Sequence, residues 1–107
     1  MRKAIRSGAL MAAIVFLGCS ALFAQSPGEA TYKAKCQSCH GAAGLADTSA
    51  GKAIKVKPVT DPSVKKLTEA EMVAATHNGM GKMQPYKDKL SDAEIKGAVD
   101  YFRTFLK

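Results

Sequence analysis

The sequence has few side chains from which a metal cluster or a complex active site could be assembled. Its 107 residues include three cysteines and two histidines. No segment is rich in strand-forming residues, and no internal repeat or low-complexity tract is present. The lack of strands argues against the βαβ pattern that accompanies a thioredoxin-like cysteine pair. We therefore expect an all-α protein.

The sequence also lacks arginine-rich runs and aromatic residues interleaved with basic ones, which are typical of nucleic-acid binding. The formal net charge is +7, but three of the sixteen basic residues lie within the first 24 positions, which hold no acidic residue. Thirteen basic and nine acidic residues remain beyond that point, a balance of +4. So small a charge on scattered lysines is typical of a solvated surface. We expect no nucleic-acid partner.

The N-terminal residues have the pattern of a secretory signal peptide. Three basic residues within the first six positions precede an apolar run over about residues 9–17, and small residues lead to a cleavage point after Ala24. The apolar run is too short to span a bilayer comfortably. Residues 1–24 are therefore predicted to be a removed signal peptide, and residues 25–107 one exported domain without stable membrane insertion.

Cys19 lies inside this predicted signal peptide. Residues 16–19 read Phe-Leu-Gly-Cys, which faintly resembles the lipobox of a bacterial lipoprotein, although such boxes favour Leu three places before the cysteine. A lipid anchor at Cys19 is therefore the alternative to its loss with the signal peptide. In both cases the domain keeps only the pair Cys36 and Cys39.

This pair belongs to the run Cys-Gln-Ser-Cys-His, which extends from Cys36 to His40. A Cys-x-x-Cys-His run is typical of c-type haem attachment. The two thiols add across the vinyl groups of the porphyrin, and the adjacent imidazole becomes the proximal ligand of the iron. The run predicts one covalent haem c, held through Cys36 and Cys39 and ligated by His40.

Two other kinds of site use a Cys-x-x-Cys pair, namely a redox dithiol and half of a zinc site. A zinc site needs about four nitrogen or sulfur ligands, and the only other candidates are His77 and Cys19. A covalent porphyrin would also give the 83 residues after position 24 an apolar body to pack around, which so short a chain often needs. We therefore favour haem.

Three segments begin with residues that favour a helix start. Ser26, followed by proline and then by Glu29, predicts a capping box and a helix that runs to about Ser38. Thr68 and Ser91 open two further capping boxes, and the last helix carries an apolar stripe at helical spacing. The stripe consists of Ile95, Ala98, Val99, Phe102 and Phe105 or Leu106. Residues 41–66 predict a long loop with one short helix over residues 50–55.

Taken together, these features resemble a class I c-type cytochrome, especially the short single-domain bacterial kind. The matching stretches are Gly28-x-x-x-Tyr32, Cys36 to Gly41, Gly79 to Tyr86 and Leu90 to Ile95. The resemblance covers residues 27–107 and implies a small cytochrome c fold, with three main helices and long loops wrapped around a covalently bound haem. It also implies that haem attachment takes place outside the cytoplasm.

The same resemblance implies that the first and last helices cross, so that Gly28 and Tyr32 meet Ala98 and Tyr101. A second implication concerns the imidazole of the attachment motif. In the family a proline carbonyl in the following loop accepts its N–H. This chain has serine at the expected position 49, so we expect a backbone carbonyl nearby to orient the ring instead.

The second axial ligand of the iron is expected to be a methionine, because a thioether paired with histidine raises the reduction potential. Met83 is the predicted ligand, since it stands in a loop before the last helix, where the family places its ligand. Gln84 separates it from the proline that usually follows directly. Met80 between two glycines is the rival, whereas Met72 is expected in the core and His77 at a helix end.

The resemblance and the His40/Met83 pair imply a soluble periplasmic electron carrier that cycles between Fe(III) and Fe(II), not an enzyme. We expect a monomer that docks with redox partner proteins through acidic surfaces on those partners. The lysines expected to ring the haem edge are Lys33, Lys35, Lys82, Lys87 and Lys89. A solvated surface is the alternative role for these lysines.

The alternative function is a haem-based enzyme or a gas-binding sensor domain. Such a protein needs an open or displaceable sixth site and a polar distal pocket. No distal pairing of histidine with arginine is evident, since Arg103 on the last predicted helix is the only arginine after residue 24. A carrier dedicated to one enzyme complex would have the same sequence features as a general carrier.

Overall fold

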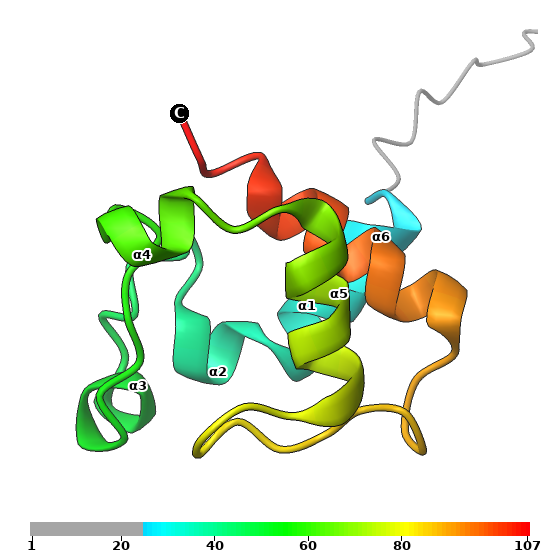
Figure 1. The fold of residues 1–107 in the computed structure, drawn as a ribbon, viewed down its shortest axis with the longest axis horizontal. Coiled ribbons are helices and arrows are strands. Elements are labelled where there is room, and N and C mark those ends of the chain that lie inside the picture. Colours follow the sequence, from blue (N-terminus) through cyan, green and yellow to red (C-terminus); the bar gives the residue numbers. More distant parts are fainter. Residues whose placement is uncertain (1–24) are drawn as a thin grey trace, which may run out of the picture.

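The structure, a computed structural model, describes residues 25–107, so the predicted signal peptide and Cys19 lie outside the described residues. The elements in order are α1 (Pro27–Lys35), α2 (Gln37–His40), α3 (Ser49–Ala53), α4 (Pro62–Lys65), α5 (Glu69–Asn78) and α6 (Asp92–Arg103) (Figure 1). Within residues 25–107 the only β-type pairing is an isolated bridge between Met80 and Met83. The expected all-α fold is confirmed.

Helices α1 and α6 cross each other in close contact (Figure 1). A Cβ atom added to Gly28 would collide with the backbone of Gly97, so the two helices touch through their main chains. The backbone toward which a side chain at position 28 would point is therefore that of Gly97, the residue next to the expected Ala98. A glycine on each helix removes both side chains from the contact. The second expected contact is confirmed, because the rings of Tyr32 and Tyr101 lie 5.2 Å apart.

The core lies between these two helices and contains the apolar stripe of α6. Ile95 is fully buried, and Ala98 and Val99 are buried beside it. Tyr32, Tyr101, Phe102 and Phe105 form an aromatic cluster in which the ring of Tyr32 lies 6.2 Å from Phe102 and 5.7 Å from Phe105. Offset and edge-to-face contacts of this kind stabilise beyond simple burial.

Each of the three predicted helix starts is capped by the residue that the sequence predicted. At α5 the Thr68 N–H donates to Glu71 and the Glu71 N–H donates to the Thr68 hydroxyl, and Ser91 does the same with Glu94 at α6. These two capping boxes are confirmed. Ser26 caps α1 by accepting from the Glu29 N–H, but the Glu29 carboxylate pairs with Lys33 at 2.8 Å, so only half of the expected box is present.

The first predicted helix is shorter than expected because it breaks at Cys36. Helix α1 ends at Lys35, and α2 starts again after one non-helical residue, Cys36, with φ −116°. Side-chain hydrogen bonds hold the second turn: Ser38 accepts from the Thr48 hydroxyl, and Gly41 accepts from the hydroxyl of Tyr32 on α1. These contacts fix the direction of α2 relative to α1 and to the residue that caps α3.

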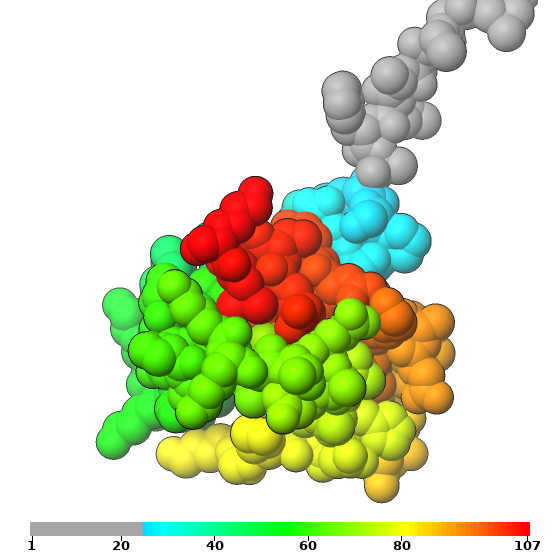
Figure 2. Space-filling model, turned by 45° about the horizontal axis from the view of Figure 1, so that its top comes forward, coloured from blue at the N-terminus to red at the C-terminus, as the bar shows by residue number. Residues whose placement is uncertain are grey.

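The long segment between α2 and α5 holds two short helices. Helix α3 begins one residue before the predicted short helix and ends two residues earlier than expected. Helix α4 was not predicted, although Asp61 caps it by accepting from the Ser63 N–H at 2.8 Å, with Pro62 at the first helical position. An acidic cap followed by proline is a recognised helix-start signal. Figure 2 shows this green part of the chain on the side away from the start of α1.

Candidate haem-attachment site

The Cys36 to His40 run forms one compact helical turn. The His40 N–H donates to the Cys36 carbonyl at 2.9 Å and the Gly41 N–H donates to Gln37 at 2.8 Å. Cys36 and Cys39 are free and half-buried, and their spacing of three places them on one side of the turn. The turn therefore presents two thiols and an imidazole from five consecutive residues.

The acidity of the first thiol bears on the alternative sites. Burial raises the pKa of Cys36 to about 11, and the charge of Cys39 adds to the shift. A thiol with so high a pKa stays protonated at neutral pH, whereas reactive dithiols act as thiolates. The environment of Cys36 therefore disfavours the redox dithiol, and residues 25–107 hold no group of three histidine, cysteine or acidic side chains that could bind zinc.

The carbonyl end of the turn is held by Tyr32 of α1. Gly41 ends α2 with φ +84°, a conformation that favours glycine. The Tyr32 hydroxyl donates to the Gly41 carbonyl at 2.6 Å in a buried position. Burial raises the pKa of Tyr32 well above its usual value, so the hydroxyl remains a donor at physiological pH. The aromatic cluster is thereby linked to the residue that follows His40.

Helix α3 holds the turn from the opposite side. The Thr48 hydroxyl donates to the Ser38 carbonyl at 2.7 Å and accepts from the Gly51 N–H at 2.9 Å. A Cβ atom on Gly51 would collide with the Cys39 carbonyl, so α3 lies directly against the turn. This support was not predicted, although Thr48 before a short helix is a residue type that favours the N-cap.

His40 lies between the turn and the aromatic cluster. Its ring packs edge-on against Phe102 with 5.4 Å between centroids. Burial lowers the pKa of His40, so the imidazole is neutral at neutral pH and can donate a lone pair to a metal.

One ring nitrogen of His40 has no hydrogen-bond partner. Nδ1 is the only buried side-chain nitrogen or oxygen without a partner among residues 25–107, and the expected carbonyl near Ser49 does not bond to it. A buried polar atom without a partner is costly unless a bound group changes its surroundings. Two free cysteines and a neutral, incompletely satisfied imidazole together fit the donor set of a c-type haem.

The predicted sixth-ligand residue lies in a tight turn after α5. Met80 and Met83 exchange both backbone hydrogen bonds, at 3.1 and 2.9 Å, around Gly81 with φ +58°. Met83 is half-buried, whereas Met80 is 63% exposed. Met72 is buried in the core as expected, with its sulfur 3.9 Å from the Arg103 guanidinium.

The Met83 turn is attached to the end of α5. The Tyr86 N–H donates to Thr76 at 3.0 Å and the Lys87 N–H donates to the His77 carbonyl at 3.2 Å. The His77 ring has its own partners, since Nδ1 lies 2.8 Å from Asn78 Oδ1 and Nε2 lies 3.8 Å from the Asp92 carboxylate. His77 therefore sits at a helix end, where the sequence placed it.

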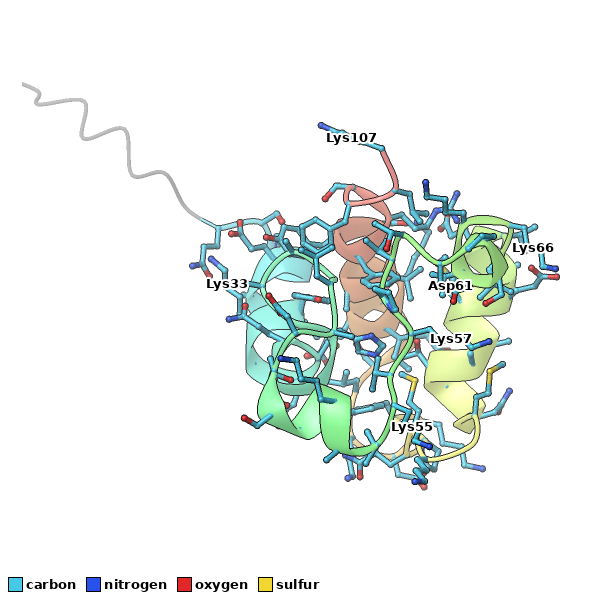
Figure 3. All side chains as sticks on the ribbon, turned by 90° about the vertical axis from the view of Figure 1, so that its left-hand side faces the viewer. Lys33, Lys55, Lys57, Asp61, Lys66 and Lys107 are labelled. Carbon is cyan, nitrogen blue, oxygen red and sulfur yellow. The ribbon has the colours of Figure 1, made fainter. Side chains whose placement is uncertain are left out.

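The lysines are spread over the molecule. All five lysines named for the haem edge are exposed, and Lys33 is paired with Glu29. In Figure 3 the labelled lysines Lys33, Lys55 and Lys66 lie at separate edges of the molecule.

An open groove of about 740 Å³ separates α5 from α6. Ion pairs cross it, with Lys96 3.0 Å from Glu69. It contains none of the predicted site residues, and its charged groups are exposed and paired with each other. We therefore place the functional site at the Cys36 to His40 turn, where the donor atoms are.

No helix within residues 25–107 is long and apolar enough to cross a membrane.

Solved structures similar to this one are small cytochromes. The KustC0563 c-type cytochrome shares 28% identity over 75% of this chain and 98% of its own, with a TM-score of 0.68. Cytochrome c6C from Synechococcus sp. PCC 7002 shares 22% identity over 74% and 93%, with a TM-score of 0.58. Cytochrome c6 from the diatom Phaeodactylum tricornutum shares 23% identity over 73% and 88%, with a TM-score of 0.57. The predicted small cytochrome c fold is confirmed.

No curated protein sequence matches the chain. A family model described as "Cytochrome C oxidase, cbb3-type, subunit III" matches residues 23–102, which include the whole Cys36 to His40 turn and the Met83 turn. The chain therefore belongs to this family of c-type cytochrome domains, which implies haem c as cofactor and electron transfer as the function that the haem supports.

Proposed function

We propose that this protein is an exported electron carrier with one haem c. In this proposal Cys36 and Cys39 attach the haem through thioether bonds, and His40 and Met83 ligate the iron. The signal peptide over residues 1–24 delivers the chain to the periplasm, where haem is attached. The mature domain works as a monomer.

One observation carries the proposal: the turn from Cys36 to His40 is held rigidly from two sides while its own functional groups remain uncommitted. Tyr32 and Thr48 fix its backbone through buried or short hydrogen bonds. The two cysteines form no disulfide, and His40 Nδ1 has no partner. A rigid turn with free thiols and a neutral imidazole is what covalent attachment of a macrocycle needs.

When bound, a haem supplies reversible one-electron chemistry between Fe(III) and Fe(II). The protein residues hold it and limit what else can happen. His40, whose ring packs edge-on against Phe102, would ligate the iron from one side. Met83 would supply the second iron ligand from a turn that is hydrogen-bonded to α5. With two side chains of this chain as ligands, the iron would have no site open to a substrate, so we propose a carrier and not an enzyme.

Partner proteins would dock transiently at an exposed edge. The exposed lysines attract acidic partner surfaces over distances up to the Debye length of about 10 Å at 0.1 M salt. Association rates should therefore fall as ionic strength rises. An association rate that does not change with salt would refute electrostatic docking. It would leave the proposed haem ligation standing, because the ligation does not depend on how partners dock.

The test is an intact mass and a visible spectrum of exported material. We expect one haem, cleavage after Ala24, a low-spin spectrum and the far-red band of a thioether–Fe(III) bond. A lipid mass at Cys19 would overturn the cleavage assignment alone. Colourless protein with free thiols would overturn the haem proposal, and a high-spin ferric spectrum that changes at once with cyanide would favour the enzyme or sensor alternative.

Met83→Ala and Met80→Ala form a matched pair for the axial ligand. We expect the Met83 variant to lose the thioether band and to have a much lower reduction potential, because thioether ligation raises the potential. The Met80 variant should keep both, since Met80 lies 63% exposed on the same turn. Loss of the band in the Met80 variant alone would show that the ligand has been assigned to the wrong methionine.

A further inference from the structure

Tyr86 connects the Met83 turn to the segment that precedes the attachment motif. Its hydroxyl donates to the backbone carbonyl of Lys35 at 3.1 Å, across 51 positions of sequence. Lys35 is the last residue of α1, and the next residue is Cys36. The bond therefore joins the segment that carries one predicted axial ligand directly to the segment that carries the first haem cysteine.

Gln84 supports this bond from the other side of the hydroxyl. Its amide Nε2 donates to Tyr86 Oη at 3.2 Å, and its Oε1 accepts from the Lys89 ammonium at 2.5 Å. Lys89 also lies 5.8 Å from the centre of the Tyr86 ring. Gln84 stands between Met83 and Pro85, which the family resemblance would place next to each other. In this chain it supplies a hydrogen bond to the tyrosine hydroxyl.

The tether has no substitute among the described contacts of this segment. The hydrogen bonds that leave residues 79–90 toward the rest of the described chain are three backbone bonds to α5 and the Tyr86 bond to α1. The backbone bonds start from Gly79, Tyr86 and Lys87. Without the hydroxyl, the hydrogen bonds of the segment would reach α5 only, so the Tyr86 bond is its one hydrogen-bonded restraint toward the attachment motif.

We propose that Tyr86 is a positioning residue that holds the Met83 thioether at the iron and protects the sixth position against displacement by outside ligands. This inference rests on the proposed His40/Met83 ligation. The hydroxyl acts through the turn, because it bonds to the backbone of α1 and not to an axial ligand. Gln84 contributes by holding the hydroxyl in the direction of Lys35.

The test compares Tyr86→Phe with Tyr101→Phe in the haem-loaded protein. The Tyr101 variant is the matched control, because the Tyr101 hydroxyl makes no hydrogen bond among the described residues, whereas its ring packs in the aromatic cluster. Imidazole is added to the ferric protein, and its affinity is read from the loss of the thioether band. Imidazole enters only when the turn swings away, so its complex lacks the tether in every variant.

Removing the tether therefore destabilises the methionine-bound form alone. We expect Tyr86→Phe to bind imidazole about threefold more tightly than the unaltered protein, which corresponds to a weak, partly exposed hydrogen bond. Tyr101→Phe should bind as the unaltered protein does. The reduction potential of the methionine-bound form should stay the same in both variants, because the ligand pair is unchanged. Gln84→Ala should shift imidazole affinity in the same direction by a smaller factor.

The outcomes separate this inference from the proposed ligation. If the unaltered protein has no thioether band, the ligation proposal fails before the variants are compared. If it has the band and Tyr86→Phe binds imidazole no more tightly than Tyr101→Phe, the role of Tyr86 is refuted while the ligation stands. If Tyr86→Phe and Tyr101→Phe lose the same folding stability and neither changes imidazole affinity, Tyr86 has only a structural role and the inference is likewise refuted.

Discussion

The crossing of α1 and α6 predicts that two glycines in direct contact will respond very differently to the same substitution. A methyl group on Gly28 would point into the backbone of Gly97, which no side-chain movement can relieve. A methyl group on Gly97 would meet the Cα of Gly28 at 3.2 Å and its nitrogen at 3.5 Å, a contact that a small shift relieves. The asymmetry follows from the direction of each missing Cβ.

The magnitudes can be worked out from general values. Overpacking costs about 1–3 kcal/mol, and a backbone clash belongs at the upper end. Alanine gains about 1 kcal/mol over glycine in a helix interior, and less in the first turn, where Gly28 lies. We expect Gly28→Ala to lower the free energy of unfolding by about 2 kcal/mol, net of that gain. At Gly97, in the interior of α6, the gain and the mild contact should nearly cancel, to within about 0.5 kcal/mol.

The assay is urea unfolding of the haem-loaded variants, with thermal unfolding as a second measurement. A loss of about 2 kcal/mol in a domain of this size lowers Tm by roughly 10 °C. Equal effects at the two positions, or a larger effect at Gly97, would refute the reasoning, because both residues lie in the same contact. A changed m-value would mean that the variant altered the unfolded or native ensemble and would require a second probe.

Two further substitutions test local chemistry. Thr48→Val removes the donor to Ser38 and the cap of α3, so we expect a loss of about 2 kcal/mol in urea unfolding, with Thr48→Ser close to the unaltered protein. Hydrogen bonds from Ser91 lower the pKa of Glu94 below its usual value. Since the folded-state pKa is depressed, this stabilisation is present above the usual glutamate pKa and is lost as pH falls through the folded value. Stability measured across acidic pH should therefore decline less steeply in Glu94→Gln, and an identical decline would contradict the assignment.

Local chemistry explains why the helix starts were predictable from the sequence. Thr68 and Ser91 each meet a glutamate three residues on, and both pairs close as reciprocal hydrogen bonds. At Ser26 only one of the two bonds of the capping box forms, because the Glu29 carboxylate pairs instead with Lys33, one turn further along. The choice between a backbone N–H and a lysine is a competition between near-equal interactions, which sequence spacing alone does not decide.

Tertiary contacts explain what the sequence could not predict. The helix break at Cys36 follows from bonds to Tyr32 and Thr48, and the pairing of Gly28 with Gly97 follows from the crossing point of two helices. Neither feature depends on the helix propensity of the residue concerned or on the spacing of apolar residues around it. Helix α4 is different, since Asp61 followed by proline is a helix-start signal in the sequence itself.

The attachment motif combines, within one site, features that the local sequence predicts and features that tertiary contacts decide. Five residues suffice to predict the chemistry of thiols and imidazole, but they do not fix the direction in which the turn points. That direction depends on Gly51, which lets α3 reach the Cys39 carbonyl, and on the Tyr32 hydroxyl, which reaches from α1 to Gly41. Because these supports come from opposite sides, a change to one should tilt the turn and not unfold it. Covalent attachment of a rigid macrocycle at two points tolerates little tilt, so the yield of haem-loaded protein should fall when these distant residues are changed, even though both cysteines are present.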